Sequence, residues 1–293
     1  MVTDFIRAVI DGVLSGSVYA LMAAGLTLIF GVMEVINIAQ GILVILGAYL
    51  SYVLSVHLGI DLFAGLIITI PVMFILGVGI QWGLMSRLGE REKVSMSILV
   101  TYAVAIILEG ALDLIFGPSY QQLSAWYVNK SMHVLGFYLP YIYVFGFLLA
   151  VVLLGALYFI LYRTEFGRSL RAAQQNRTAA RLIGIDVNRV SAITFGIGVA
   201  VTAAGGMVFG ATTSFNANSS ADLISRLLTI IILGGMGSIG GAMGASVLML
   251  VIEALVSTFW SPTWATLVFY AVLVVVLAIR PTGLFGQKAV RAQ

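Results

Sequence analysis

The sequence predicts an all-α, polytopic membrane protein with about nine spanning helices, within a range of about eight to ten. Hydrophobic residues make up 61% of its 293 residues and charged residues 9%, whereas soluble globular proteins have about 45–50% and about 25%. Such a chain lacks the charged surface that a soluble fold needs. Apolar runs of spanning length recur along it, and no alternating pattern of about ten residues repeats as in a β-barrel.

The expected spans follow from the need for about 20 mostly apolar residues per crossing. They lie at 8–31, 39–57, 62–85, 95–117, 138–162, 190–213, 223–239, 241–260 and 263–280. The first is not a cleavable signal peptide, because Asp11 lies inside it and no basic segment precedes it. We therefore expect one membrane domain over residues 1–293, with no soluble appendage.

The distribution of Lys and Arg predicts the orientation. Segments 86–93, 163–189 and 280–293 carry three, six and three of the 15 basic residues, while 118–137 carries only Lys130. Basic loops stay in the cytoplasm, so these three segments are expected there and 118–137 outside. The number of crossings between them then places the N-terminus outside and the C-terminus in the cytoplasm.

The longest connection, 163–189, predicts a short helix on the cytoplasmic face. Good helix formers fill residues 169–183, and Gly184 follows as a C-cap signal. A small apolar face lies among the arginines of this segment. Two interpretations remain open: a basic loop that lies against anionic lipid, or a surface that docks to a partner protein.

Polar residues interrupt the apolar sequence between the first two spans. Glu34, Asn37 and Gln40 are spaced by three residues, which would place them roughly on one side of a helix. The next segment runs only about 17 residues to His57, which is short for a span. A helix broken inside the membrane, lining a permeation pathway, explains both features. The alternative is an ordinary cytoplasmic turn.

The glycine run at 234–241 matches the dinucleotide-binding pattern G-x-G-x-x-G. No strand precedes it in a βαβ unit and no acidic residue lies about 20 positions beyond it, so we reject that function. Close helix packing, or a hinge, explains the glycines better. The positions expected to act in this way are Gly234, Gly235, Gly237, Gly240 and Gly241.

Ionisable residues within or beside the spans are functional candidates. Structural ion pairs are expected at i, i+4 spacing, Arg7 with Asp11 and Asp222 with Arg226. Glu109 and Asp113 share one helix face and either line an outer cavity or pair with Arg226. For Glu253, deeper in its span, we expect an interhelical hydrogen bond.

The chain offers no catalytic set. It has no cysteine, two histidines and no G-x-x-x-x-G-K-[ST] loop. We therefore expect no enzymatic activity, no metal and no cofactor bound by this chain. If transport is driven by ATP, the ATP and Mg must be bound by another subunit.

Four motifs in order resemble those of one family. Residues 165–168 (EFGR) and 179–185 (AARLIGI), with Arg171 and Asn176 between them, resemble the cytoplasmic coupling loop of ABC importer permeases. Residues 37–41 (NIAQG) are similar to the Asn-Phe-Ala-His-Gly motif of the branched-chain amino acid permease family, LivH type. Residues 234–242 and 280–286 are similar to its Gly-Gly-x-Gly-Ser-x-x-Gly-Ala and Pro-Thr-Gly-x-x-Gly motifs. The resemblance covers residues 12–286.

This resemblance implies a permease subunit that imports branched-chain or related amino acids across the bacterial inner membrane. It implies a second related permease subunit, two ATP-binding subunits and an extracytoplasmic binding protein as partners. The coupling loop would dock on an ATP-binding subunit through Arg168, Arg171, Asn176, Ala180, Leu182 and Gly184. The candidates for lining the pathway, which would lie between two permease chains, are Glu34, Asn37, Gln40, Gly41 and Glu109.

One departure from the family concerns Gln40, which stands where many relatives have His. Gln cannot take up a proton near neutral pH, which argues against a proton-linked role at this position. The alternative substrates within the family are urea, short amides, other amino acids and aromatic acids. The alternative of another class is an ATP-independent secondary transporter, which predicts inverted repeats; no clear repeat is present.

Overall fold

The computed structural model describes residues 1–89, 93–134 and 137–286. Within these residues, nine helices are long and apolar enough to cross a membrane, as the sequence predicts. They are α1 (Val2–Met33), α2 (Gln40–Leu58), α3 (Leu62–Gly83), α4 (Lys93–Phe116), α5 (Tyr141–Arg163), α8 (Val187–Thr212), α9 (Ser220–Gly234), α10 (Ile239–Phe259) and α11 (Pro262–Ile279).

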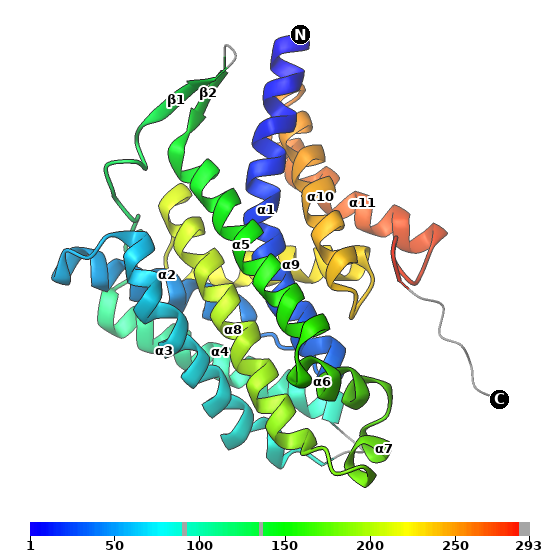
Figure 1. Cartoon of the computed structure of the whole chain (residues 1–293). Coiled ribbons are helices and arrows are strands. Elements are labelled where there is room, and N and C mark those ends of the chain that lie inside the picture. Colours follow the sequence, from blue (N-terminus) through cyan, green and yellow to red (C-terminus); the bar gives the residue numbers. More distant parts are fainter. Residues whose placement is uncertain (90–92, 135–136, 287–293) are drawn as a thin grey trace.

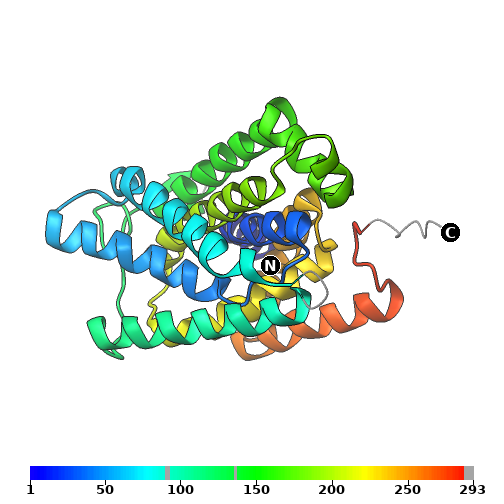
Figure 2. The same ribbon diagram turned by 90° about the horizontal axis from the view of Figure 1, so that it is seen from below.

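Helices α1 and α8 form the centre of the bundle, with about three quarters of their most apolar windows buried. Helices α2, α3, α5 and α10 pack around this pair (Figure 1). In contrast, α4 and α11 are only 17% and 11% buried, and they follow one edge of the molecule (Figure 2). That edge therefore needs lipid or a protein partner to cover it.

Small residues let the central helices approach closely. A Cβ on Gly12 would lie 2.5 Å from the Val251 Cα on α10, and one on Gly16 would lie 2.7 Å from the Val247 Cα. On α8, a Cβ on Gly206 would collide with the backbone of Val44. These contacts follow the small-xxx-small spacing of the sequence.

The segment between α4 and α5 contains a hairpin that the all-α prediction lacks. Strands β1 (Ser131–Val134) and β2 (Phe137–Pro140) pair antiparallel, so α5 begins at Tyr141 rather than at 138. The preceding loop is tied to α3 because the Tyr127 hydroxyl donates to Asp61 Oδ2 at 2.9 Å. Burial, together with this hydrogen bond, raises the pKa of Tyr127.

The prediction of one helix over 169–183 is wrong. The segment forms two helices, α6 (Glu165–Gln175) and α7 (Arg177–Leu182). Asn176 separates them, because its side chain accepts a hydrogen bond from the Ala179 N–H at 2.9 Å. Asn is a favoured N-cap residue, so it ends one helix and starts another. Gly184 follows with φ +87°.

The span expected at 223–239 also has different ends. The helix α9 starts at Ser220 and stops at Gly234, five residues short of the prediction. Gly235 and Gly237 adopt φ values of +91° and +85°, which residues with a side chain rarely reach. The glycine run is therefore a turn between α9 and α10.

The two ends of the bundle differ in what they carry. The N-terminus and the β1–β2 hairpin lie at one end, and α6 and α7 lie at the other (Figure 1). This separation agrees with the predicted placement of 118–137 and 163–189 on opposite sides of the membrane, and which side is cytoplasmic stays a prediction. The basic residues Arg91, Lys288 and Arg291 lie outside the described residues.

Candidate functional site

The break between α1 and α2 lies inside the bundle. Gln40 Nε2 donates to the Thr202 hydroxyl, which in turn donates to the Met22 carbonyl at 3.4 Å. Thr202 and Met22 stand near the middle of α8 and α1. Asn37 Nδ2 donates to Gln40 Oε1 at 2.8 Å, and both side chains are fully buried. The part of the segment with Asn37 and Gln40 therefore lies beside the inner turns of the central helices rather than at a bundle end.

The backbone of this segment is also satisfied from α4. The Ile38 N–H donates to the Thr101 hydroxyl at 3.1 Å, and that hydroxyl donates to the Ser97 carbonyl at 2.7 Å. A Cβ on Gly41 would lie 3.0 Å from the Ile224 Cβ on α9 and would collide with its first turn. Gly41 thus allows α2 to begin against α9. Irregular backbone at this depth is tolerated because protein buries it.

The three polar residues of the break do not share a face. The segment between them is not helical, so the side chain of Glu34 lies apart from those of Asn37 and Gln40. Glu34 ends α1 in the left-handed conformation with φ +53°, and its side chain is exposed. It is the one non-glycine residue with positive φ in the described part of the chain.

A pocket of about 470 Å³ lies beside the break, between α4, α9 and the start of α2. Glu109 and Asp113 line it from α4, so they face a cavity, and its placement on the outer side stays a prediction. Glu109 Oε2 accepts a hydrogen bond from the Ser220 hydroxyl at 3.2 Å. Asp113 Oδ1 is buried and has no hydrogen-bond partner among the described residues. The pocket therefore offers carboxylate oxygens to a donor.

Arg226 pairs elsewhere, which rules out the other alternative. Its Nη1 donates to both carboxylate oxygens of Glu253 at 2.8 and 2.9 Å, and its Nε donates to Asp222 at 3.0 Å. Its guanidinium also lies 5.4 Å from the ring centroid of Phe269. The pair predicted with Asp222 is confirmed, and the interhelical bond expected of Glu253 is an ion pair. This cluster ties α9, α10 and α11 together.

The segment with α6 and α7 is fixed to the bundle on one side and exposed on the other. Leu170, Ala173 and Ala180 are buried, whereas Leu182 and Ile183 are 84% and 76% exposed. The two neighbouring side chains lie outside the nine helices of spanning length, so they form a small exposed apolar surface on this segment.

Two arginines of α6 have different surroundings. Arg168 forms an exposed ion pair with Glu165, with 3.2 Å between the charged atoms. Arg171 is half-buried, donates from Nη1 to the Leu161 carbonyl at the end of α5, and lies over the ring of Tyr162. Arg171 therefore fastens α6 to α5.

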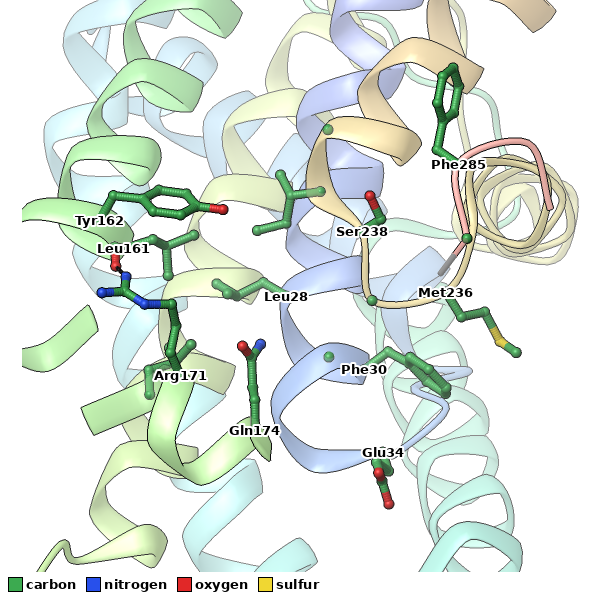
Figure 3. A pocket seen from close by; sticks show the side chains of 16 residues that line it. Leu28, Phe30, Glu34, Leu161, Tyr162, Arg171, Gln174, Met236, Ser238 and Phe285 are labelled. Carbon is green, nitrogen blue, oxygen red and sulfur yellow. Dashed lines mark hydrogen bonds between the residues drawn. The ribbon is translucent and has the colours of Figure 1, made fainter. Parts of the chain in front are cut away.

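A second pocket, of about 650 Å³, lies where α6 faces the end of α1 and the turn between α9 and α10. In Figure 3 the Gln174 amide and the Tyr162 hydroxyl point into it, while Glu34 points away from the other side chains. Ser238 lines it from the turn and caps α10 by accepting from the Gly241 N–H at 3.1 Å. The pocket brings three elements distant in sequence together.

The glycine turn is clamped by the end of the described chain. The Leu284 N–H donates to the Leu233 carbonyl at 2.7 Å. A Cβ on Gly235 would lie 2.5 Å from the Gly286 nitrogen, and one on Gly234 would lie 2.6 Å from the Gly241 carbonyl carbon. Gly237 has open surroundings apart from the Gly31 Cα at 3.6 Å, and Gly240 has nothing within 4 Å. Close packing therefore involves Gly234, Gly235 and Gly241, but not Gly240.

The match to known proteins covers almost the whole chain. The family model of the branched-chain amino acid transport system permease component matches residues 8–277. The chain belongs to this family. It is therefore a multi-pass membrane permease, in agreement with its nine apolar helices in the described residues.

Three relatives illustrate the similarity. The branched-chain amino acid permease protein LivH of Salmonella typhimurium is 30% identical over 98% of this chain and 97% of its own length. The corresponding protein BraD of Pseudomonas aeruginosa is 27% identical over the same shares. A probable LivH of Methanocaldococcus jannaschii is 26% identical over 96% of this chain and 92% of its own.

Two residues of the site escaped sequence analysis. Thr202 and Thr101 hold the break, yet each is one of several serine and threonine residues in its span. Such residues usually bond the backbone of their own helix, so nothing in the pattern distinguishes them. The bond between Gln40 and Thr202 joins positions 162 residues apart.

The ion pair of Arg226 with Glu253 predicts how the thermal stability of a single and a double variant should differ. We expect Arg226→Met to lower the melting temperature, because it leaves Glu253 without its cation. Breaking a fully buried pair costs about 3–5 kcal/mol, and less here because 15% and 19% of the two side chains remain exposed. The double variant Arg226→Met/Glu253→Met should regain most of the loss. Thermal unfolding of the purified permease tests this, and a double variant no more stable than the single one contradicts it.

Proposed function

We propose that this chain is the transmembrane permease subunit of a binding-protein-dependent ABC importer for branched-chain or related amino acids. The observation that carries the proposal is the match to amino acid permeases over nearly the full chain. The subunit catalyses no reaction itself. ATP and Mg bind to separate subunits, and the protein resides in the bacterial inner membrane with α6 and α7 in the cytoplasm.

The α6–α7 segment acts as the coupling surface. Leu182 and Ile183 supply exposed apolar contacts for a groove on the ATP-binding subunit. Arg168, Asn176 and Gly184 shape the same segment through the ion pair, the cap and the left-handed turn described above, whereas Ala180 is buried and anchors it to the bundle. Arg171 passes a displacement of α6 to α5, since it bonds the last turn of that helix.

The translocation pathway lies between this chain and a second, related permease subunit. The sparsely buried helices α4 and α11 follow one edge (Figure 2), which supports a protein partner there. The pocket with Glu109 and Asp113 opens between α4 and α9. An amino acid presents an ammonium group, which carboxylates bind well. Asn37, Gln40 and Gly41 shape the wall behind the pocket.

The assembly thus contains two permease subunits, two ATP-binding subunits and an extracytoplasmic binding protein at the hairpin end. Other small polar or aromatic substrates of the same family are the second candidates. An ATP-independent secondary transporter is the alternative of another class, and the first experiment below separates it.

The coupling surface is tested by Leu182→Asp. We expect the ATP-binding subunits to co-purify with the tagged wild-type permease in mild detergent. Their recovery should fall at least about tenfold in the variant, because it places a charge where the ATP-binding subunit would bury an apolar side chain. The control is Leu58→Asp, which changes an exposed leucine at the last residue of α2, outside the α6–α7 segment, and should retain them. A permease that transports in liposomes without ATP would establish the secondary transporter instead.

The pathway pocket is tested by Asp113→Asn and Glu109→Gln. Removing a charged acceptor of the substrate ammonium should lower leucine uptake about 10- to 100-fold, from about 1.5–3 kcal/mol per charged hydrogen bond. The control, Asp11→Asn, removes a half-exposed carboxylate on α1 and should leave uptake near the wild-type value. Uptake of labelled leucine into cells measures this. Equal uptake by all variants would remove the pocket from the pathway.

A further inference from the structure

An apolar crevice of about 500 Å³ runs along the bundle between α1, α5 and α10. Val151 and Gly155 line it from α5, and Met243 and Val247 from α10. Ser17 is among its few polar residues, and its hydroxyl is already satisfied by the Leu14 carbonyl at 2.6 Å. Val151 is 53% exposed, so the crevice opens on the outside of the bundle.

The position of the crevice decides what fills it. Its walls are helices of membrane-spanning length, so its mouth faces the hydrocarbon of the bilayer. An apolar cavity holds no ordered water. If it stayed empty, the side chains that line it would lose dispersion contacts. The apolar chains available at this depth are those of the lipids.

The crevice continues into the 650 Å³ pocket beside α6. The two share Leu161, Tyr162, Ile239 and Gly240 as lining residues. At this polar end the Tyr162 hydroxyl and the Gln174 amide point inward (Figure 3), and Ser238 lies at the amino end of α10. The first turn of a helix carries partial positive charge. An apolar channel that ends in hydrogen-bond donors matches the two parts of a phospholipid.

Charge at the polar end favours an anionic headgroup. Arg171 lines the pocket, and its guanidinium has further N–H groups besides the one that bonds Leu161. The surrounding segment 163–189 is rich in arginine. Glu34 is the one carboxylate among the pocket's described lining residues, and it points away from the others (Figure 3). Basic pockets between spanning helices are typical sites for anionic lipid headgroups.

We propose that this channel binds one anionic glycerophospholipid, with an acyl chain in the crevice between α1, α5 and α10 and the phosphate at Arg171 and Gln174. The lipid then bridges α6 to the first turn of α10. This proposal rests on the protein being embedded in a membrane, and it holds whichever substrate the protein transports.

The acyl-chain half is tested by filling the crevice. A Cβ on Gly155 meets nothing within 4 Å, so Gly155→Phe places a ring in the crevice without a backbone clash. Gly79→Phe is the matched control, because Gly79 on α3 is equally open and lies outside the crevice lining. We expect phospholipid retained by the permease, purified with its associated subunits, to fall at least about tenfold in Gly155→Phe only. Native mass spectrometry measures it, and Gly155→Leu replaces the Phe variant if that one does not fold.

The proposed headgroup site is tested by replacing one side-chain amide with a carboxylate. Gln174→Glu places a negative charge in the polar pocket, whereas Gln175→Glu places the same charge on the neighbouring residue outside the lining. After delipidation, binding of added phosphatidylglycerol should be about tenfold weaker in Gln174→Glu and unchanged in Gln175→Glu. Phosphatidylcholine should bind more weakly than phosphatidylglycerol to the wild type.

Two results would overturn the proposal. One is equal lipid retention by Gly155→Phe and Gly79→Phe. The other is equal binding of phosphatidylglycerol and phosphatidylcholine that does not respond to Gln174→Glu, as expected of lipid that merely surrounds the protein.

Discussion

The hydrogen bonds of Gln40 hold a non-helical segment in the middle of the bundle, and Ile38 of this segment lines the pocket that contains Glu109 and Asp113. Each unsatisfied backbone group inside a membrane costs several kcal/mol, so the break requires protein partners. Gln40 donates to Thr202 while it accepts from Asn37. A protonated histidine has no acceptor. Glutamine is not protonated near neutral pH, so its amide can donate one of these bonds and accept the other at the same time.

The break and the segment that we propose as the coupling surface meet at the pocket beside α6. The end of α1, the α9–α10 turn and α6 all line it, and the clamp between Leu284 and Leu233 holds the turn from behind. A displacement of α6 thus changes the surroundings of both irregular segments. The end of α1 lines this pocket, and α1 and α8 are the most buried helices. A change at the pocket therefore acts directly on a central helix.

The sequence predicts the parts of this arrangement that depend on local patterns. The nine spans and the pair of Asp222 with Arg226 follow from patterns along one segment of the chain. The division of α6 from α7 was missed because the capping preference of Asn176 competes with strong helix formers on both sides. The pairing of Gln40 with Thr202 and of Arg226 with Glu253 joins separate helices, and no local pattern specifies which helices become neighbours.

The most direct test of the buried break uses thiol labelling, because the chain has no cysteine of its own. Single variants Glu34→Cys, Val35→Cys and Ala39→Cys are exposed in membranes opened to both sides to a charged maleimide. Glu34 is exposed, whereas Val35 and Ala39 are at most 1% exposed. The structure predicts rapid labelling at position 34 and labelling at least about tenfold slower at 35 and 39. Labelling of all three at the rate of position 34 would place the segment in a surface turn and contradict the account.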